Sequence, residues 1–317
     1  MNPSNIQNAG VLAAIGNTSL VQLTKVVPPN CGNVFVKLEW ENPTGSMKDR
    51  AAQSMIQQAE TDGRLKPGDR VVEYTGGSTG IAIGLICIAK GYRLHIVTSD
   101  AFSIDKRNQM EAFGATLQLV PSENGKTTKS LILKMIDLAK SVSEEPDTYW
   151  PNQLSNRDSI AGYHSLGHEI WNDMGGNVDA FVHSVGSSAS FQGVGTILRQ
   201  RRSNIDLVAV EPAESAVLSG GQPGPHKIEG IGVGYIPPLW DQHLPSSVVP
   251  VETEEAKRMT RRLALEEGLF AGTSSGANVS AAIEWGKRIG PGKNVVTLLP
   301  DTGLKYMNTD VFHTNEK

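Results

Sequence analysis

The sequence lacks the features that mark disulfide-rich, zinc-binding or membrane-spanning proteins. Its 317 residues include only two cysteines, Cys31 and Cys87, and neither has a partner at metal-ligand spacing. A disulfide scaffold or a metal site is therefore not expected, and a reducing cytoplasm is the natural setting. No apolar run reaches about 18 residues, so we expect no membrane-spanning helix. Residues 1–10 are polar, without a basic stretch followed by an apolar one, so we expect no secretory signal.

The chain also lacks a long basic run and a strong excess of either charge. It has 29 Lys and Arg against 33 Asp and Glu, a net charge of −4, so a nucleic-acid partner is not expected. Hydrophobic residues make up 39% and charged residues 20%, as in folded globular proteins. The length fits two domains of about 100–200 residues or one large α/β unit. Glycine is abundant at 33 residues, and it is needed where the backbone turns sharply or approaches a ligand closely.

Short runs typical of buried strands alternate with amphipathic segments. This order predicts an α/β fold of parallel sheets covered by helices on both faces. Region 211–250 differs, since it is rich in Gly and Pro and has little periodicity. We expect a long loop there with a functional role. The predicted strands are 34–39, 70–74, 93–99, 116–120, 180–185, 207–210 and 295–299. The predicted helices lie near 47–62, 80–90, 104–113, 127–142, 158–174, 191–202, 253–267 and 276–289.

Ligands of such sheets bind at the turns that follow the carboxyl ends of strands. The turn after the first predicted strand contains Lys48, and Ser46 with Asp49 resembles a capping box, which places Lys48 in the first turn of a helix. A cation is unfavourable beside the unpaired N–H groups there, so the neutral, nucleophilic amine is favoured. The alternative is an ordinary solvated surface lysine.

Three further turns are rich in small residues and each leads into a predicted helix. Turns 75–80 and 186–193 expose N–H groups that would suit a carboxylate or a phosphate, although each could also be a plain tight turn. No Gly-Lys-Ser/Thr follows the second, so it is not a Walker loop. Hydroxyls of turn 271–276 could meet a heterocycle nitrogen or merely cap a helix. Together with Lys48, these turns match the needs of pyridoxal phosphate.

Residues 42–50, Asn-Pro-Thr-Gly-Ser-Met-Lys-Asp-Arg, resemble the Schiff-base lysine motif of the cysteine synthase / cystathionine β-synthase family. This family belongs to the fold type II pyridoxal-phosphate enzymes. The resemblance runs from residues 15–20 to 299–303, and segments 211–221 and 224–237 are similar to the cysteine synthase branch in particular.

The resemblance implies a two-domain architecture, each domain a mostly parallel sheet covered by helices. The smaller, mobile N-terminal domain would span 42–150, and residues 1–41 with 151–317 would form the larger, cofactor-binding domain. Movement of the segment near 76–150 over the cofactor is the expected gate. The resemblance further implies a cytoplasmic homodimer with pyridoxal 5′-phosphate, no metal ion, and a small amino acid and a small nucleophile as substrates.

Site residues follow from the matching positions. Lys48 would form the Schiff base with the cofactor and move the α-proton, and Ser274 would hydrogen-bond the pyridine nitrogen. The substrate carboxylate would be held by Thr75, Gly76, Gly77, Ser78, Thr79 and Gln153. The cofactor phosphate would be held by Gly186, Ser187, Ser188, Ala189 and Ser190.

Two of these turns depart from the family pattern. Ser78 stands where the family usually has an Asn that contacts the 3′ oxygen of the cofactor, so Ser78 is also a cofactor-binding candidate. The phosphate loop, usually Gly-Thr-Gly-Gly-Thr, has lost two glycines at Ser188 and Ala189. If the loop needs a positive φ at either position, the residue there is strained.

The implied activity is β-replacement on a serine derivative, namely O-acetylserine plus sulfide giving cysteine and acetate through an α-aminoacrylate. One alternative is β-elimination from serine or cysteine, giving pyruvate and ammonia. Another is replacement by a different nucleophile such as homocysteine. A third is a regulatory protein that binds the cofactor without turnover, and the intact Lys48, Gln153 and Ser274 argue against it.

Overall fold

The computed structural model describes residues 10–313, and the chain divides into two compact units. The first spans Met1–Ile15 and Lys48–Gly162, and the second spans Gly16–Met47 and Tyr163–Lys317. The predicted smaller domain spanned 42–150, with residues 1–41 in the larger one. In the structure, residues 10–15 belong with the first unit, and the chain passes from one unit to the other after residues 47 and 162. The predicted mobility of the smaller domain stays a prediction. The expectation of no secretory signal rests on residues 1–10, of which 1–9 lie outside the described part.

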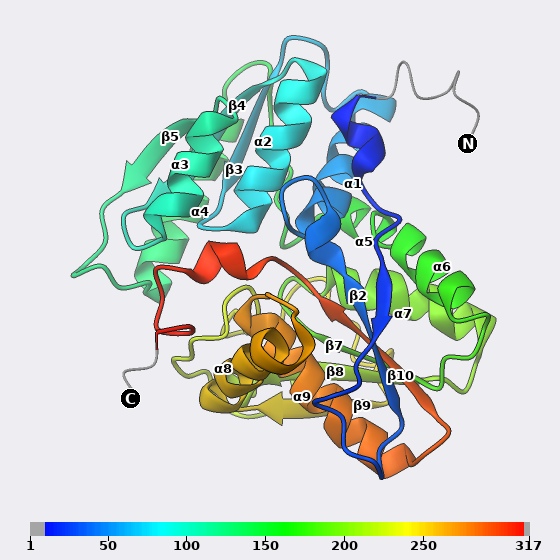
Figure 1. Ribbon diagram of the computed structural model, residues 1–317. Coiled ribbons are helices and arrows are strands. Elements are labelled where there is room, and N and C mark those ends of the chain that lie inside the picture. The colour runs from blue at the N-terminus through cyan, green and yellow to red at the C-terminus, as the bar shows by residue number, and fades with distance from the viewer. Residues whose placement is uncertain (1–9, 314–317) are drawn as a thin grey trace. The chain divides into compact units, whose positions relative to one another are not determined.

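The first unit is built on a four-stranded parallel sheet with the order β5-β4-β3-β6. Figure 1 shows its helices beside the sheet. The strands are β3 (Arg70–Tyr74), β4 (Arg93–Ser99), β5 (Thr116–Val120) and β6 (Thr148–Tyr149). The helices are η2 (Val11–Ala14), α1 (Lys48–Thr61), α2 (Ser78–Lys90), α3 (Ile104–Ala112), α4 (Lys129–Ser143) and α5 (Asp158–Ala161).

Alternating strand residues give this sheet two buried faces. Val71 packs in a cluster with side chains from α1, α2 and α3, whereas its neighbour Val72 packs in a second cluster with side chains from α4. Successive side chains of a strand point to opposite faces, so the run Val71–Val72 requires a helical layer on each side. Packing on both faces of the sheet therefore fixes the carboxyl end of β3, where the turn to α2 begins.

The second unit is built on a six-stranded sheet with the order β1-β2-β10-β7-β8-β9, parallel except for the antiparallel edge strand β1. Its strands are β1 (Leu20–Gln22), β2 (Asn33–Leu38), β7 (Ala180–Ser184), β8 (Asp206–Pro212), β9 (Ser247–Val251) and β10 (Asn294–Leu299). Its helices are α6 (His164–Asp173), α7 (Ala189–Arg201), α8 (Thr253–Arg262) and α9 (Thr273–Ile289). Short helical turns are η3 (Glu39–Glu41), η4 (Ala213–Ser215), η6 (Gly303–Tyr306) and the π-helical η5 (Leu263–Glu267).

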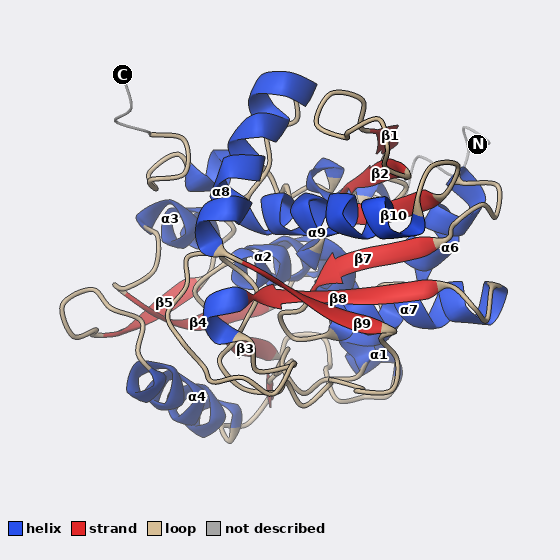
Figure 2. Ribbon diagram, turned by 90° about the horizontal axis from the view of Figure 1, so that it is seen from below, coloured by secondary structure: helices blue, strands red, loops and turns tan. Residues whose placement is uncertain are grey.

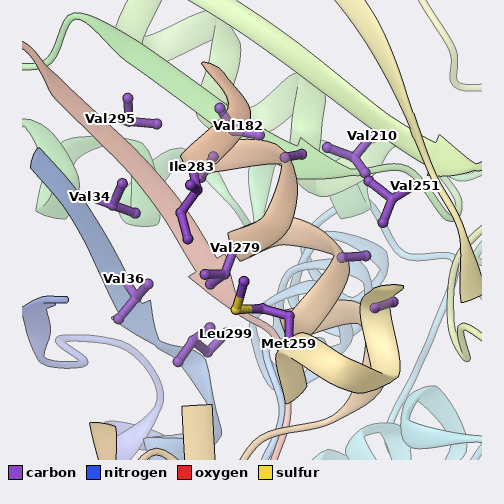
Figure 3. Close-up of a cluster of buried hydrophobic side chains, with 14 of the residues drawn as sticks. Val34, Val36, Val182, Val210, Val251, Met259, Val279, Ile283, Val295 and Leu299 are labelled. Atoms are coloured by element: carbon purple, nitrogen blue, oxygen red, sulfur yellow. The ribbon is translucent and has the colours of Figure 1, made fainter. Parts of the chain in front are cut away.

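Helices cover both faces of this sheet (Figure 2). Valines of β2, β7, β8 and β10 form one cluster with Met259 of α8 and Val279 of α9 (Figure 3). Phe181, one residue before Val182 in β7, instead stacks on Phe191 of α7, with ring centroids 6.3 Å apart. Neighbouring side chains of β7 therefore pack on opposite faces of the sheet, and this packing fixes the carboxyl end of β7, which leads into α7.

The predicted fold class is confirmed, and the predicted strands agree with the observed ones to within two residues at each end. Two expectations were wrong. Region 211–250 is not all loop, because β8 reaches Pro212, η4 follows it, and β9 begins at Ser247. Helix α9 begins at Thr273, three residues earlier than expected, so the hydroxyl turn is the first turn of the helix itself. No helix among residues 10–313 is long and apolar enough to cross a membrane.

Candidate active site

The turn before Lys48 is fixed by hydrogen bonds within the second unit. The Asn42 side chain accepts a hydrogen bond from Gly16 N at 2.9 Å and donates to the backbone oxygen of Glu39 at 2.8 Å. Gly45 has a φ of +71°, which glycine adopts without strain, and Met47 N donates to Pro300 O at 2.9 Å. The anchored turn delivers Lys48 as the first residue of α1, as the sequence predicted.

The predicted carboxylate-binding turn joins β3 to α2 in the first unit. Gly77 is the N-cap of α2 and makes no side-chain cap, and its own N–H donates to Thr75 Oγ1 at 3.2 Å. At Gly76 an added Cβ would lie 2.2 Å from the ring of Phe102, so a side chain there would displace that ring. The Thr79 hydroxyl donates to Gln153 Oε1 at 2.5 Å. The structure thus brings together two of the residues predicted to hold the substrate carboxylate.

A buried carboxylate at the end of β3 supports the same region, and the sequence analysis missed it. Glu73 is fully buried. Its Oε1 accepts from Trp150 Nε1 and from Tyr74 N, both at 3.0 Å, and its Oε2 accepts from Gln153 N at 3.2 Å. Burial raises the pKa of Glu73 to about 7, while these N–H donors oppose the rise. Its position between Val72 and Tyr74 in a buried strand is the signal that could have revealed it, because buried charges need partners.

The predicted phosphate turn joins β7 to α7 in the second unit. Ser188, the N-cap of α7, is buried and has a φ of +77° and a ψ of −14°, the left-handed conformation. The sequence predicts strain at Ser188 or Ala189 if the loop requires a positive φ, and the positive φ lies at Ser188. At Gly186 an added Cβ would lie 2.4 Å from Gly230 O, so only glycine fits there.

Ser190 lies in the first turn of α7, and its hydroxyl contacts a residue that the sequence analysis did not consider. His183 Nε2 lies 2.8 Å from Ser190 Oγ, and His183 Nδ1 lies 3.2 Å from the side-chain nitrogen of Asn278 in α9. His183 occupies the buried strand β7, where a polar ring directly after three apolar residues could have been noticed from sequence.

Ser274 is the second residue of α9 and is 4% exposed. The N-cap of this helix is Gly272, which makes no side-chain cap. The alternative that this hydroxyl serves as the helix cap is therefore wrong. Asn278, one turn further on, accepts a hydrogen bond from Ser184 N at 2.8 Å. This bond ties the first turns of α9 to the carboxyl end of β7, so Ser274 and turn 186–190 lie at the same end of the sheet.

Comparison with known proteins assigns the class of the chain. Residues 11–301 match the family of pyridoxal-phosphate dependent enzymes, and the chain belongs to this family. It is 42% identical over 301 residues to a cysteine synthase of Staphylococcus aureus, covering 94% of this chain and 95% of the relative.

Solved structures give the same result. A cysteine synthase from Entamoeba histolytica is 35% identical with a TM-score of 0.89, covering 97% of this chain and 91% of that one. A hydrogen sulfide-producing enzyme from Fusobacterium nucleatum is also 35% identical, with a TM-score of 0.87 and coverage of 94% and 97%. The resemblance stated from the sequence is confirmed, and pyridoxal 5′-phosphate is the cofactor of this enzyme.

The chemistry of the candidate residues fits that cofactor. The α7 N-terminus has small residues and no side-chain cap, so its N–H groups can serve a phosphate. Lys48 is half-buried at a helix start, and Ser274 offers a neutral hydroxyl. Among residues 10–313 no three His, Cys, Asp or Glu side chains are grouped as a metal ion would require.

Proposed function

We propose that the enzyme catalyses β-replacement on O-acetylserine with sulfide, yielding cysteine and acetate. The similarity to proteins named cysteine synthase along nearly the whole chain carries this proposal. The bond between Cβ and the acetate oxygen breaks, acetate leaves with the electron pair, and the sulfide sulfur bonds to Cβ. When bound, pyridoxal phosphate supplies an electron sink for the α-carbon.

In this proposal Lys48 binds the cofactor covalently, takes the proton from the substrate α-carbon and returns it after sulfide has added. Thr79 and Gln153, already joined by a hydrogen bond, orient the substrate carboxylate together with the N–H groups of turn 75–79. The turn 186–190 holds the phosphate, and the Ser274 hydroxyl faces the pyridine nitrogen. Because serine supplies no counter-charge, that nitrogen remains largely unprotonated.

A second candidate function is net elimination from cysteine, giving hydrogen sulfide, pyruvate and ammonia. The likeness to a hydrogen sulfide-producing enzyme favours it. Both reactions use the same removal of the α-proton and differ in whether a nucleophile adds at Cβ or water finally releases pyruvate. Product analysis separates them, because only replacement forms a new C–S bond.

The experiment supplies O-acetylserine with and without sulfide and, separately, cysteine alone, and quantifies cysteine, pyruvate and sulfide. We expect cysteine from O-acetylserine plus sulfide at a rate well above pyruvate release from cysteine. Pyruvate and sulfide as the dominant products would instead establish the second function. Borohydride reduction followed by peptide mapping should place the pyridoxyl label on Lys48, and a label on another lysine would refute the site assignment.

We also propose that the enzyme acts as a cytoplasmic homodimer, as the sequence resemblance implies. Light scattering on the purified holoenzyme measures the mass of the particle directly. A mass of one chain, 34.0 kDa, at micromolar concentration would refute the dimer.

A further inference from the structure

A buried polar network links strand β7, helix α9 and the first turn of α7. His183 lies in β7 and is 2% exposed, and Asn278 of α9 is fully buried. Polar groups in such positions are held by hydrogen bonds, and the direction of each bond fixes the proton of the next group. The proton on the His183 ring, and with it that of Ser190, can therefore be assigned.

The orientation of the Asn278 amide is fixed by two backbone groups. Its Oδ1 accepts from Ser184 N at 2.8 Å, and its Nδ2 donates to Leu298 O at 2.8 Å. The opposite orientation would place the amide oxygen against a carbonyl oxygen and the NH2 group against an N–H. Both contacts would be repulsive in a fully buried site, so only the first orientation satisfies both backbone groups.

The Asn278 amide in turn determines the protonation of His183. Asn278 Nδ2, a donor, lies 3.2 Å from His183 Nδ1, which must therefore accept and carry no proton. The neutral ring then has its proton on Nε2. Nε2 lies 2.8 Å from Ser190 Oγ and donates to it. The Ser190 oxygen accepts from the ring, which leaves the hydroxyl proton for another acceptor.

We propose that Asn278 and His183 are positioning residues that make Ser190 a hydrogen-bond donor to the cofactor phosphate. This inference rests on the proposed assignment of turn 186–190 as the phosphate site. In the opposite tautomer, His183 Nε2 would carry no proton and would accept a hydrogen bond from the Ser190 hydroxyl. A phosphate oxygen can only accept from a hydroxyl, so the tautomer decides whether Ser190 contributes to binding.

Two substitutions of His183 separate the contact with Ser190 from the contact with Asn278. His183→Gln extends an amide NH2 toward the position of Nε2 and can still donate to Ser190. His183→Asn reaches the position of Nδ1 only and cannot reach Ser190. Ser190→Ala removes the proposed phosphate donor, and the double variant His183→Asn/Ser190→Ala tests whether the two act through one hydroxyl.

The measurement is the dissociation constant of pyridoxal phosphate, obtained by returning the cofactor to resolved enzyme. We expect Ser190→Ala to weaken binding about tenfold to hundredfold, as for the loss of a bond to a charged acceptor. His183→Asn should weaken it about threefold to tenfold, His183→Gln by less than about twofold, and the double variant no more than Ser190→Ala alone. The phosphorus NMR shift of the holoenzyme should move with Ser190→Ala and His183→Asn but not with His183→Gln.

Nitrogen NMR of His183 in the holoenzyme reads the tautomer without any substitution. A proton on Nδ1 would overturn the proposal, as would an equal further loss of affinity when His183→Asn is added to Ser190→Ala. Unchanged affinity in Ser190→Ala would show that this hydroxyl donates nothing to the phosphate and would also overturn the proposal. That outcome would leave the backbone N–H groups of turn 186–190 as the phosphate site, while Lys48 labelling and product analysis would still test the enzymatic activity.

Discussion

Ser188 carries the clearest local strain in the second unit. Among the described non-glycine residues with a positive φ, it is the one that is neither Asn nor Asp, the types that tolerate this region. The left-handed conformation costs an L-residue about 1–2 kcal/mol. Strain of this kind persists where the surroundings demand it, here at the N-cap of the helix predicted to face the phosphate.

Replacing Ser188 with Gly should raise the free energy of unfolding by about 0.5–1 kcal/mol, because relief of strain exceeds the added freedom of the unfolded chain. Ser187→Gly is the matched control, since Ser187 is not left-handed, and it should lower stability by about 0.5–1 kcal/mol. Urea unfolding at a fixed cofactor concentration measures both. An equal decrease in the free energy of unfolding in the two variants would mean that the backbone of Ser188 is not strained.

Turns and helix starts carried most of the sequence information about the site. Small residues after β3 and β7 predicted both turns, and Lys48 was placed correctly at the start of α1. The supporting residues Glu73 and His183 were missed because a strand pattern records burial but does not reveal which distant side chains will meet it. Asn278 is an example, since it meets His183 across a sequence separation of 95 residues.

At the scale of whole elements, the longer strands rich in apolar residues were predictable, whereas three of the strands at sheet edges, β1, β6 and β9, were not. The segments that form β3, β4 and β5 were predicted with the observed bounds, because each contains several residues of the types enriched in strands, although β5 lies at a sheet edge. Strands β1 and β6, of three and two residues, are too short to show a period. Strand β9 contains Pro250 and pairs only with β8 at the sheet edge, so its composition reads as loop.

Strand β3 and segment 150–153 are joined through Glu73, and this connection should depend on pH. Glu73 has a pKa of about 7 in the folded protein against an ordinary value of 4.5. The folded state therefore binds this proton more tightly than the unfolded state. The contribution of Glu73 protonation to the free energy of unfolding is fully present below pH 4.5. It is lost as the pH rises to about 7, a change of about 3 kcal/mol.

Comparison with Glu73→Gln isolates that contribution, since the amide does not titrate in this range. The parent-minus-variant difference in unfolding free energy should fall as the pH rises from about 4.5 to 7 and then level off. The variant should also raise KM for the amino-acid substrate, because its NH2 group would face N–H donors that now hold segment 150–153. A difference that rises with pH would show that the N–H donors outweigh burial and keep Glu73 ionised.

At the scale of the whole molecule, the polypeptide crosses between its two units three times, after residues 15, 47 and 162. Each unit has its own sheet and its own buried clusters. Neither unit is a continuous segment, so neither can be expressed alone as one uninterrupted piece of the chain. Stability is therefore best tested on the full chain, with the cofactor as the variable.

Removal of pyridoxal phosphate should lower the temperature of unfolding, because a ligand that binds only the folded state stabilises it by mass action. Free cofactor at about 100 times its dissociation constant contributes about 2.7 kcal/mol, which corresponds to several degrees for a chain of this size. Lys48→Ala removes the proposed covalent attachment. In this variant the cofactor should raise the temperature of unfolding by less, but the increase should still grow with added cofactor, since the phosphate turn remains. Calorimetry of both proteins across a cofactor series measures this. A Lys48→Ala protein whose unfolding temperature ignores added cofactor would mean that the lysine alone retains it, and that turn 186–190 contributes nothing to binding.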